Sequence, residues 1–189
     1  FQVDEAQNVY GLWLLGSRKF STYDFYAPPH LFLLRPLLWF ADTAPALYLS
    51  VRMAWLTAFA ALGWLLLRAS GIRPGESLFT PAVAALGLTA PLWTYGLEIR
   101  HEVPGVLALL GCWTLLAPFD GKPRRFAYLL VGGLSGFVLL NAPKHILFLA
   151  PLLLLALVRP HPAYAACSRF RLFAGLSGGF VAGVSLLLL

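Results

Sequence analysis

The placement of a few charges between long apolar stretches constrains the fold of this chain most strongly. Of its 189 residues, 59% are hydrophobic and 12% are charged, whereas a soluble domain has roughly 25% charged residues. Several apolar runs are about 15 to 23 residues long, and a helix needs about 20 to cross a bilayer. No segment alternates as a strand of a membrane β-barrel would. The sequence therefore predicts an all-α, polytopic transmembrane helical bundle.

We predict five spans and the beginning of a sixth. They cover residues 44–67, 78–97, 103–119, 126–140 and 145–158, and the sixth begins near residue 173. Residues 1–43 are expected to form an outer loop with interfacial helices over 6–15 and 31–40, and residues 44–189 the bundle. Because the sequence begins with Phe1 and ends with Leu189 inside an apolar run, we expect a longer chain, with another span before Phe1.

Basic residues gather in three connections of the predicted bundle. These connections hold eight bases and two acids: Arg68, Arg73, Lys122, Arg124, Arg125, Arg159, Arg169 and Arg171, with Glu76 and Asp120. The other six bases and six acids fall on the opposite side, so the formal net charge of +6 belongs to the basic connections. The positive-inside rule makes them cytoplasmic. The basicity therefore indicates topology and gives no argument for nucleic-acid binding.

The hairpin over residues 126–158 is too short for two complete crossings. Each leg has roughly 16 residues, or about 24 Å of helix, against roughly 30 Å of hydrocarbon. We therefore expect the turn Asn141-Ala142-Pro143-Lys144-His145 to lie below the outer surface and to face a polar cavity. The ladders Gly132-x-x-x-Gly136 and Gly175-x-x-x-Gly179-x-x-x-Gly183 should let helices approach closely.

Carboxylates gather on the predicted outer side, at Asp4, Glu5, Glu98 and Glu102. Two carboxylates that meet at a cavity suit a general base with an orienting group or a metal ligand. The alternatives are an N-cap of an interfacial helix for Asp4 and Glu5, and a self-paired loop around Arg100 for the other two.

Lys144 and Arg52 are the cations that stand in or beside apolar stretches on that side. Each suits a phosphate group, and the alternative for each is snorkelling to the membrane surface. His101 and His145 lie on the same side without a metal-ligand pattern, and neither C-x-x-C nor H-E-x-x-H occurs. Cys112 and Cys167 fall in a span and in a basic connection, so we expect no disulfide between them.

Five segments, in this order, carry a family resemblance: VDEAQNVYGLWLLGSRKFSTYDF, YAPPHLFLLRPLLW, ALYLSVRMAWLTAFAALGWLLLR, YGLEIRHEVPGVLALL and LLVGGLSGFVLLNAPKHILFLAPLLLL. The chain resembles the GT-C-type polytopic membrane glycosyltransferases, the family of the protein O-mannosyltransferases and the aminoarabinose transferases. It departs from that pattern in having Glu102 where many members carry Asp, and in APPH where many read His-Pro-Pro.

The resemblance implies an inverting sugar transfer from a polyprenyl-phosphate donor to a lipid, glycan or protein acceptor outside the membrane. It implies that Asp4 is the catalytic base, with Glu5 beside it and Glu102 in support. Lys144, Arg52 and Arg100 are expected at the donor phosphate. No cofactor is expected, and a divalent metal is left open. The alternative is a transporter or flippase for a lipid-linked substrate, although the chain shows no convincing inverted repeat.

The composition also favours a source and a location. Arg exceeds Lys, and Ala, Leu and Gly are abundant, as in proteins of GC-rich bacteria. We therefore expect a multi-pass protein of a bacterial cytoplasmic membrane, surrounded by membrane lipids, whose site faces outside.

Overall fold

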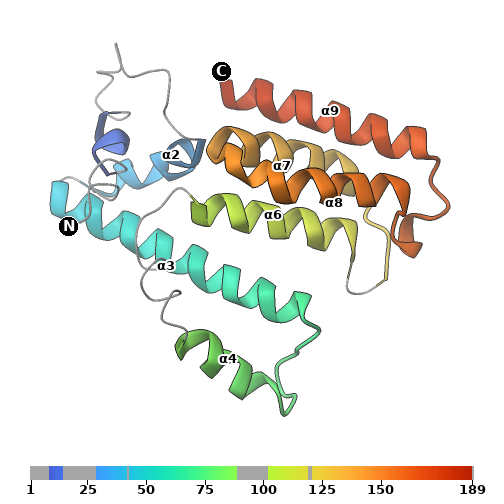
Figure 1. Ribbon diagram of the computed structural model, residues 1–189. Coiled ribbons are helices and arrows are strands. Elements are labelled where there is room, and N and C mark those ends of the chain that lie inside the picture. Colours follow the sequence, from blue (N-terminus) through green and yellow to red (C-terminus); the bar gives the residue numbers. More distant parts are fainter. Residues whose placement is uncertain (1–8, 15–28, 42, 89–101, 119–120, 189) are drawn as a thin grey trace.

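The computed structural model describes residues 9–14, 29–41, 43–88, 102–118 and 121–188 (Figure 1). This part of the chain contains helices and turns but no strand. Its elements are α2 (Pro29–Leu34), η2 (Arg35–Trp39), α3 (Ala44–Ala69), α4 (Phe79–Leu88), α6 (Glu102–Leu116), α7 (Ala127–Asn141), η3 (Pro143–His145), α8 (Ile146–Val158), η4 (Pro162–Tyr164) and α9 (Arg169–Leu188). The all-α prediction is confirmed for these residues.

Four predicted spans and the beginning of the sixth coincide with helices, whereas α4 covers the first part of the predicted span 78–97, of which residues 89–97 lie outside the described residues. The boundaries of α3, α6, α7 and α8 differ from the prediction by up to three residues, whereas α9 begins at Arg169, four residues earlier than predicted. The predicted helix over 31–40 is divided between α2 and the 3₁₀ helix η2, because Pro36 has no N–H with which to continue an α-helix. Residues 9–14 are helical, as predicted for the 6–15 segment.

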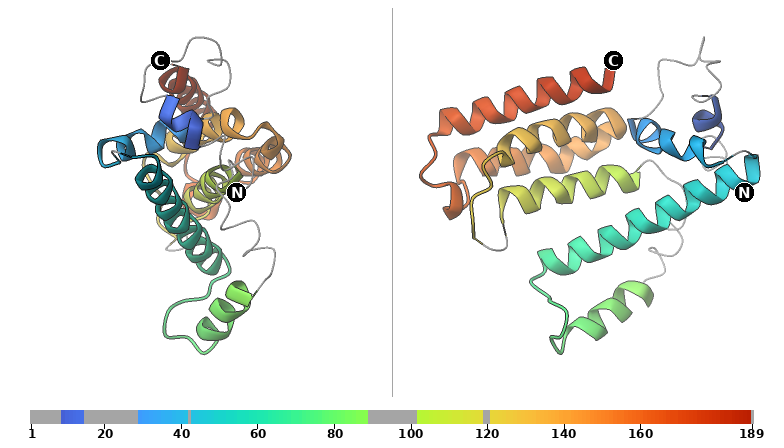
Figure 2. Two further views of the ribbon diagram at one scale, coloured as in Figure 1. Left: turned by 90° about the vertical axis from the view of Figure 1, so that its left-hand side faces the viewer. Right: turned by 180° about the vertical axis from the view of Figure 1, so that it is seen from behind.

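From α3 to α9, helices that follow one another in the chain run antiparallel, so the packed pairs α7 with α9 and α3 with α6 run parallel (Figure 1). α6, α7, α8 and α9 pack side by side, α3 lies along α6, and α4 folds back beside α3 (Figures 1 and 2). One end of the bundle, which we name the basic end, carries the connections 70–78 and 159–168 and residues 121–126. The other end, the turn end, carries the beginnings of α3 and α6 and the turn 142–145.

Two hydrophobic clusters hold the fold together. The larger joins α6, α7, α8, η4 and α9, and includes Cys112 and Val131 at 0% exposure. The smaller joins α2, α3 and the first turn of α6 through Leu31, Val51 and Val103. The beginning of α6 therefore lies where the two clusters meet.

Glycines bring α7 and α9 into backbone contact. A Cβ at Gly179 would overlap the carbonyl oxygen of Leu129, and one at Gly132 would overlap that of Leu176. A Cβ at Gly183 would lie 2.7 Å from the Cα of Gly133. The predicted close approach of the glycine ladders is confirmed, with these two helices as partners.

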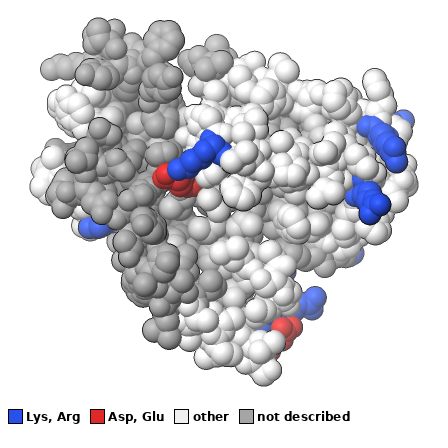
Figure 3. All heavy atoms as spheres, in the orientation of Figure 1, with Lys and Arg blue, Asp and Glu red and all other residues white. Residues whose placement is uncertain are grey.

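Two helices of the described residues are long and apolar enough to cross a membrane, Ala44–Ala69 and Arg169–Leu187. Only 17% of the most apolar window of each is buried inside the protein, whereas a core helix of a soluble domain would be mostly covered. The helices Glu102–Leu116, Ala127–Asn141 and Pro143–Val158 are apolar but shorter. In Figure 3, charged groups gather near the ends of the helices and leave an uncharged band between them.

Candidate functional site

An ion pair joins two elements at the turn end of the bundle. The Nζ of Lys144, in η3, donates to the Oε1 of Glu102, the first residue of α6, over 2.6 Å. The two residues are 42 positions apart. The Lys144 side chain is 60% exposed and that of Glu102 is 27% exposed. Glu102 and Lys144, which the sequence predicted for different roles in one site, are therefore neighbours, and the ammonium group of Lys144 is open to solvent.

Local sequence explains how both charges reach this place. α7 ends at Asn141, and Pro143 lacks the N–H that would continue the helix, so the chain makes a single 3₁₀ turn. Lys144 is the middle residue of that turn. Glu102 stands in the first turn of α6, where a negative charge is stabilised by the helix dipole.

The turn is fixed on one side by α2. The Oδ1 of Asn141 lies 2.7 Å from the Nδ1 of His30 and also accepts the backbone N–H of His30 at 3.3 Å. Both side chains are buried. The His30 ring meets Trp55 of α3 edge to face, with centroids 5.4 Å apart. A buried amide that accepts two hydrogen bonds holds the end of α7 in one orientation.

On the other side the turn is fixed by α6. The buried ring of His145 lies against Gly105, where a Cβ would come within 2.6 Å of the ring Nδ1 and 2.7 Å of Cε1. Gly105 is therefore the residue that lets this ring approach the helix. Since Asn141 and His145 are both anchored, the exposed Lys144 between them has a rigid base.

The remaining predicted site residues fall in two groups. Asp4, Glu5, Arg100 and His101 lie outside the described residues. Arg52 lies on α3, one residue after the buried Val51, and its guanidinium carbon stands 5.4 Å from the centroid of the Tyr48 ring. This contact within one helix keeps the cation on the face that Tyr48 occupies.

His30 and Gly105 take part in this arrangement and were not predicted for it, and Asn141 was expected only as part of the turn that faces a polar cavity. Each left some signal in the sequence. His30 follows a Pro-Pro pair, Asn141 interrupts an apolar run before a proline, and Gly105 follows Pro104 at the beginning of a span. Sequence alone could not show that His30 meets Asn141 or that Gly105 meets the ring of His145, because the residues of each pair belong to separate elements.

The described residues contain no group of three or more His, Cys, Asp or Glu side chains that could hold a metal ion. Whether the protein needs a divalent metal, which the sequence did not decide, is not decided by this observation. The ion pair has a different chemical capacity. An ammonium group has three donor hydrogens, so Lys144 can bind Glu102 and an anionic oxygen at the same time.

The comparisons with known proteins give no family. The chain matches no protein-family model, no curated protein sequence and no solved structure.

Proposed function

We propose that this protein is a polytopic membrane glycosyltransferase. In this proposal it moves a sugar from a polyprenyl-phosphate donor to a lipid, glycan or protein acceptor at the outer face of a bacterial cytoplasmic membrane. The observation that carries the proposal is the contact between Lys144 and Glu102. A cation and a carboxylate that the sequence proposed for one site lie together at the end of the bundle opposite the basic connections.

The helix lengths support a multi-pass arrangement with a recessed site. α7 has 15 residues, or about 22 Å of helix, so it cannot cross roughly 30 Å of hydrocarbon by itself. The turn after it packs against α6, with Ala142 and His145 buried and Pro143 and Lys144 exposed. Polar backbone at membrane depth is tolerated where protein or a polar cavity surrounds it. The ammonium group of Lys144 would then face that polar region.

The proposed reaction assigns a role to each group. The acceptor hydroxyl loses its proton to Asp4 as its oxygen attacks the anomeric carbon, and the bond from that carbon to the phosphate oxygen breaks on the opposite face. Polyprenyl phosphate leaves with the electron pair. Lys144, Arg52 and Arg100 offset the negative charge on the leaving group. Glu5 stands beside the base, and Glu102 positions Lys144.

The test measures donor binding and turnover with the full-length protein and a polyprenyl-phosphate sugar. Lys144→Ala should weaken donor affinity by about 10-fold or more, since a hydrogen bond to a charged group contributes about 1.5–3 kcal/mol. Lys144→Arg should keep part of that affinity, because it keeps the charge. Arg125→Gln, at the basic end, is the matched control and should bind the donor as the wild type does.

Equal donor affinity of the wild type and Lys144→Ala would overturn the assigned role of Lys144. The same assay separates the transferase from the transporter alternative. A transporter or flippase moves the lipid-linked sugar without cleaving the sugar–phosphate bond, so donor that crosses the membrane intact would favour it.

A further inference from the structure

An apolar groove lies between α7, α8 and α9. Its volume is about 300 Å³, at the lower limit of small-molecule sites. It is lined by Gly132, Ser135, Leu153, Leu157, Phe173, Leu176, Ser177, Phe180 and Val181. Apart from the two serine hydroxyls this lining is apolar, and the Oγ of Ser135 donates to the carbonyl of Val131 within its own helix.

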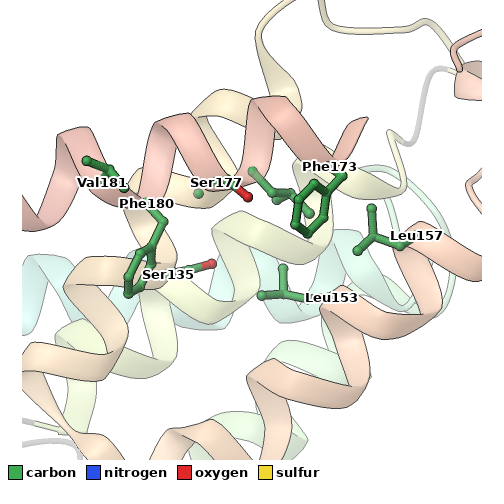
Figure 4. Close-up of a pocket in the computed structure, with 9 residues that line it drawn as sticks. Ser135, Leu153, Leu157, Phe173, Ser177, Phe180 and Val181 are labelled. Carbon is green, nitrogen blue, oxygen red and sulfur yellow. The ribbon is translucent and has the colours of Figure 1, made fainter. Parts of the chain in front are cut away.

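The groove begins at the basic end of the bundle. In Figure 4, Leu157 and Phe173 stand at one end of the groove, and Phe180, Val181 and Ser135 at the other. Leu157 is the penultimate residue of α8, and Phe173 is the fifth residue of α9. The groove therefore extends from the basic connection 159–168 toward the middle of the bundle.

Exposed arginines stand where the groove begins. Arg159 follows the last residue of α8, two positions after Leu157. Arg169 precedes Phe173 by four residues on α9, so it shares one helix face with Phe173, Leu176 and Phe180. Both arginine side chains are exposed. Among the described residues at the basic end, Glu76 is the one acidic residue, and its carboxylate accepts the backbone N–H of Arg73.

We infer that this groove with its two arginines binds one anionic glycerophospholipid of the adjoining leaflet. The phosphate of the headgroup would contact Arg159 and Arg169, and an acyl chain would lie along Leu153, Phe173 and Phe180. Charge complementarity selects this occupant, since basic pockets between membrane helices on the cytoplasmic side bind anionic headgroups. The inference rests on the membrane placement of the proposed function, and it does not depend on sugar transfer.

The test uses the full-length protein in nanodiscs of phosphatidylcholine with a minority of phosphatidylglycerol. Native mass spectrometry counts the phosphatidylglycerol that stays bound after release into detergent. Arg159→Gln and Arg169→Gln should each weaken retention about fivefold, since one arginine near an anionic surface is worth about 1 kcal/mol. Arg171→Gln removes the same charge from the opposite face of α9 and should change retention by less than about twofold.

The acyl chain is tested separately. Ser177→Phe fills the groove and should lower retention without changing the arginines. A phosphatidylglycerol with a photoreactive group in its acyl chain should label peptides that contain residues 153–157 and 173–181. Equal effects of Arg169→Gln and Arg171→Gln would show diffuse charge attraction and overturn the inference. Photolabelling spread evenly over all helices would also overturn the inference. This experiment uses the wild type, so it remains informative if Ser177→Phe fails to fold.

Failure of this inference can be distinguished from failure of the proposed function. Cys167 is exposed in the basic connection, whereas Cys112 is buried. In intact cells a membrane-impermeant maleimide should label Cys167 only after permeabilisation. Labelling from outside would overturn both the proposed topology and the cytoplasmic leaflet assigned to the lipid. Loss of lipid retention with Cys167 protected would overturn the lipid site alone.

Discussion

Helix α7 is held in the molecule in two different ways. Along its length it meets α9 through glycines, with backbone against backbone and no side chain between them at Gly132 and Gly179. At its C-terminal end it is held by polar groups, because Asn141 binds His30 of α2 and the following turn pairs Lys144 with Glu102 of α6.

The glycine contact with α9 and the polar C-terminal end of α7 differ in what they can accommodate. Where Gly179 meets Leu129, backbone lies against backbone, so no ligand can enter between the two helices there, and adding one methyl group disrupts the contact. The apolar groove lies beside this contact and is open on the side of α8. The polar end holds a hydrogen-bonded amide and an ion pair with an exposed ammonium group, which costs more to build than an apolar contact. The glycine contact therefore serves stability, whereas the polar end is the region to which the proposed function assigns a role.

The largest expected effect is on the glycine interface. Gly179→Ala should lower the free energy of unfolding by about 3 kcal/mol or more, because its Cβ would overlap backbone atoms of Leu129 that no rotamer change can move. Gly178→Ala is the matched control, since a Cβ added there would meet no atom within 4 Å, and it should leave stability unchanged or raise it by up to about 1 kcal/mol, because alanine is the better helix former. Denaturant titration in mixed micelles measures both, and equal losses would break the distinction between the regions.

The sequence predicted this interface in part, and the reason is physical. Glycine at every fourth position marks a helix face without side chains, so close packing followed directly. The sequence did not predict which helix would pack against this glycine face, because any helix face with small side chains could have done so. The positions of the helices could be predicted from apolar runs bounded by charges. The division of the 31–40 segment at Pro36 was seen only in the backbone of the structure.

A smaller effect is expected at the polar anchor of α7. Asn141→Ala should cost about 1–3 kcal/mol of stability, because the buried donors of His30 lose this acceptor. It should also weaken binding of the polyprenyl-phosphate sugar by loosening the turn that carries Lys144. Thr114→Ala, which removes a hydrogen bond within α6, should leave donor binding unchanged. Unaltered donor affinity in Asn141→Ala would mean that the anchor serves stability alone.

The smallest effect on stability is expected from the ion pair. A double-mutant cycle with Glu102→Gln and Lys144→Met should give a coupling of about 0.2–1 kcal/mol, because the ammonium group is exposed and solvent screens the pair. The same cycle measured on donor affinity should give a larger coupling if Glu102 positions Lys144 for a phosphate. A coupling of equal size in both measurements would make the pair a surface contact without a role in binding.

The candidate site could be predicted only in its charged members. Glu102 and Lys144 could be predicted because a charge beside an apolar span is energetically unfavourable in a membrane, and its position can be seen in the sequence. Their contact could not be read, since it depends on how α6 and η3 pack. The contact between His30 and Asn141 was missed for a related reason. Neutral polar residues are common at helix ends, and only their mutual burial distinguishes them.

The most direct test of the central claim is the rate of sugar transfer by the full-length protein with Asp4→Asn. This substitution keeps the shape and hydrogen bonding of the side chain but removes its basicity, so we expect a loss on the order of 10²-fold or more. Donor binding and stability should change little. A near wild-type rate in Asp4→Asn together with an inactive Glu102→Gln would move the base to Glu102. Near wild-type rates in both variants would contradict the glycosyltransferase mechanism.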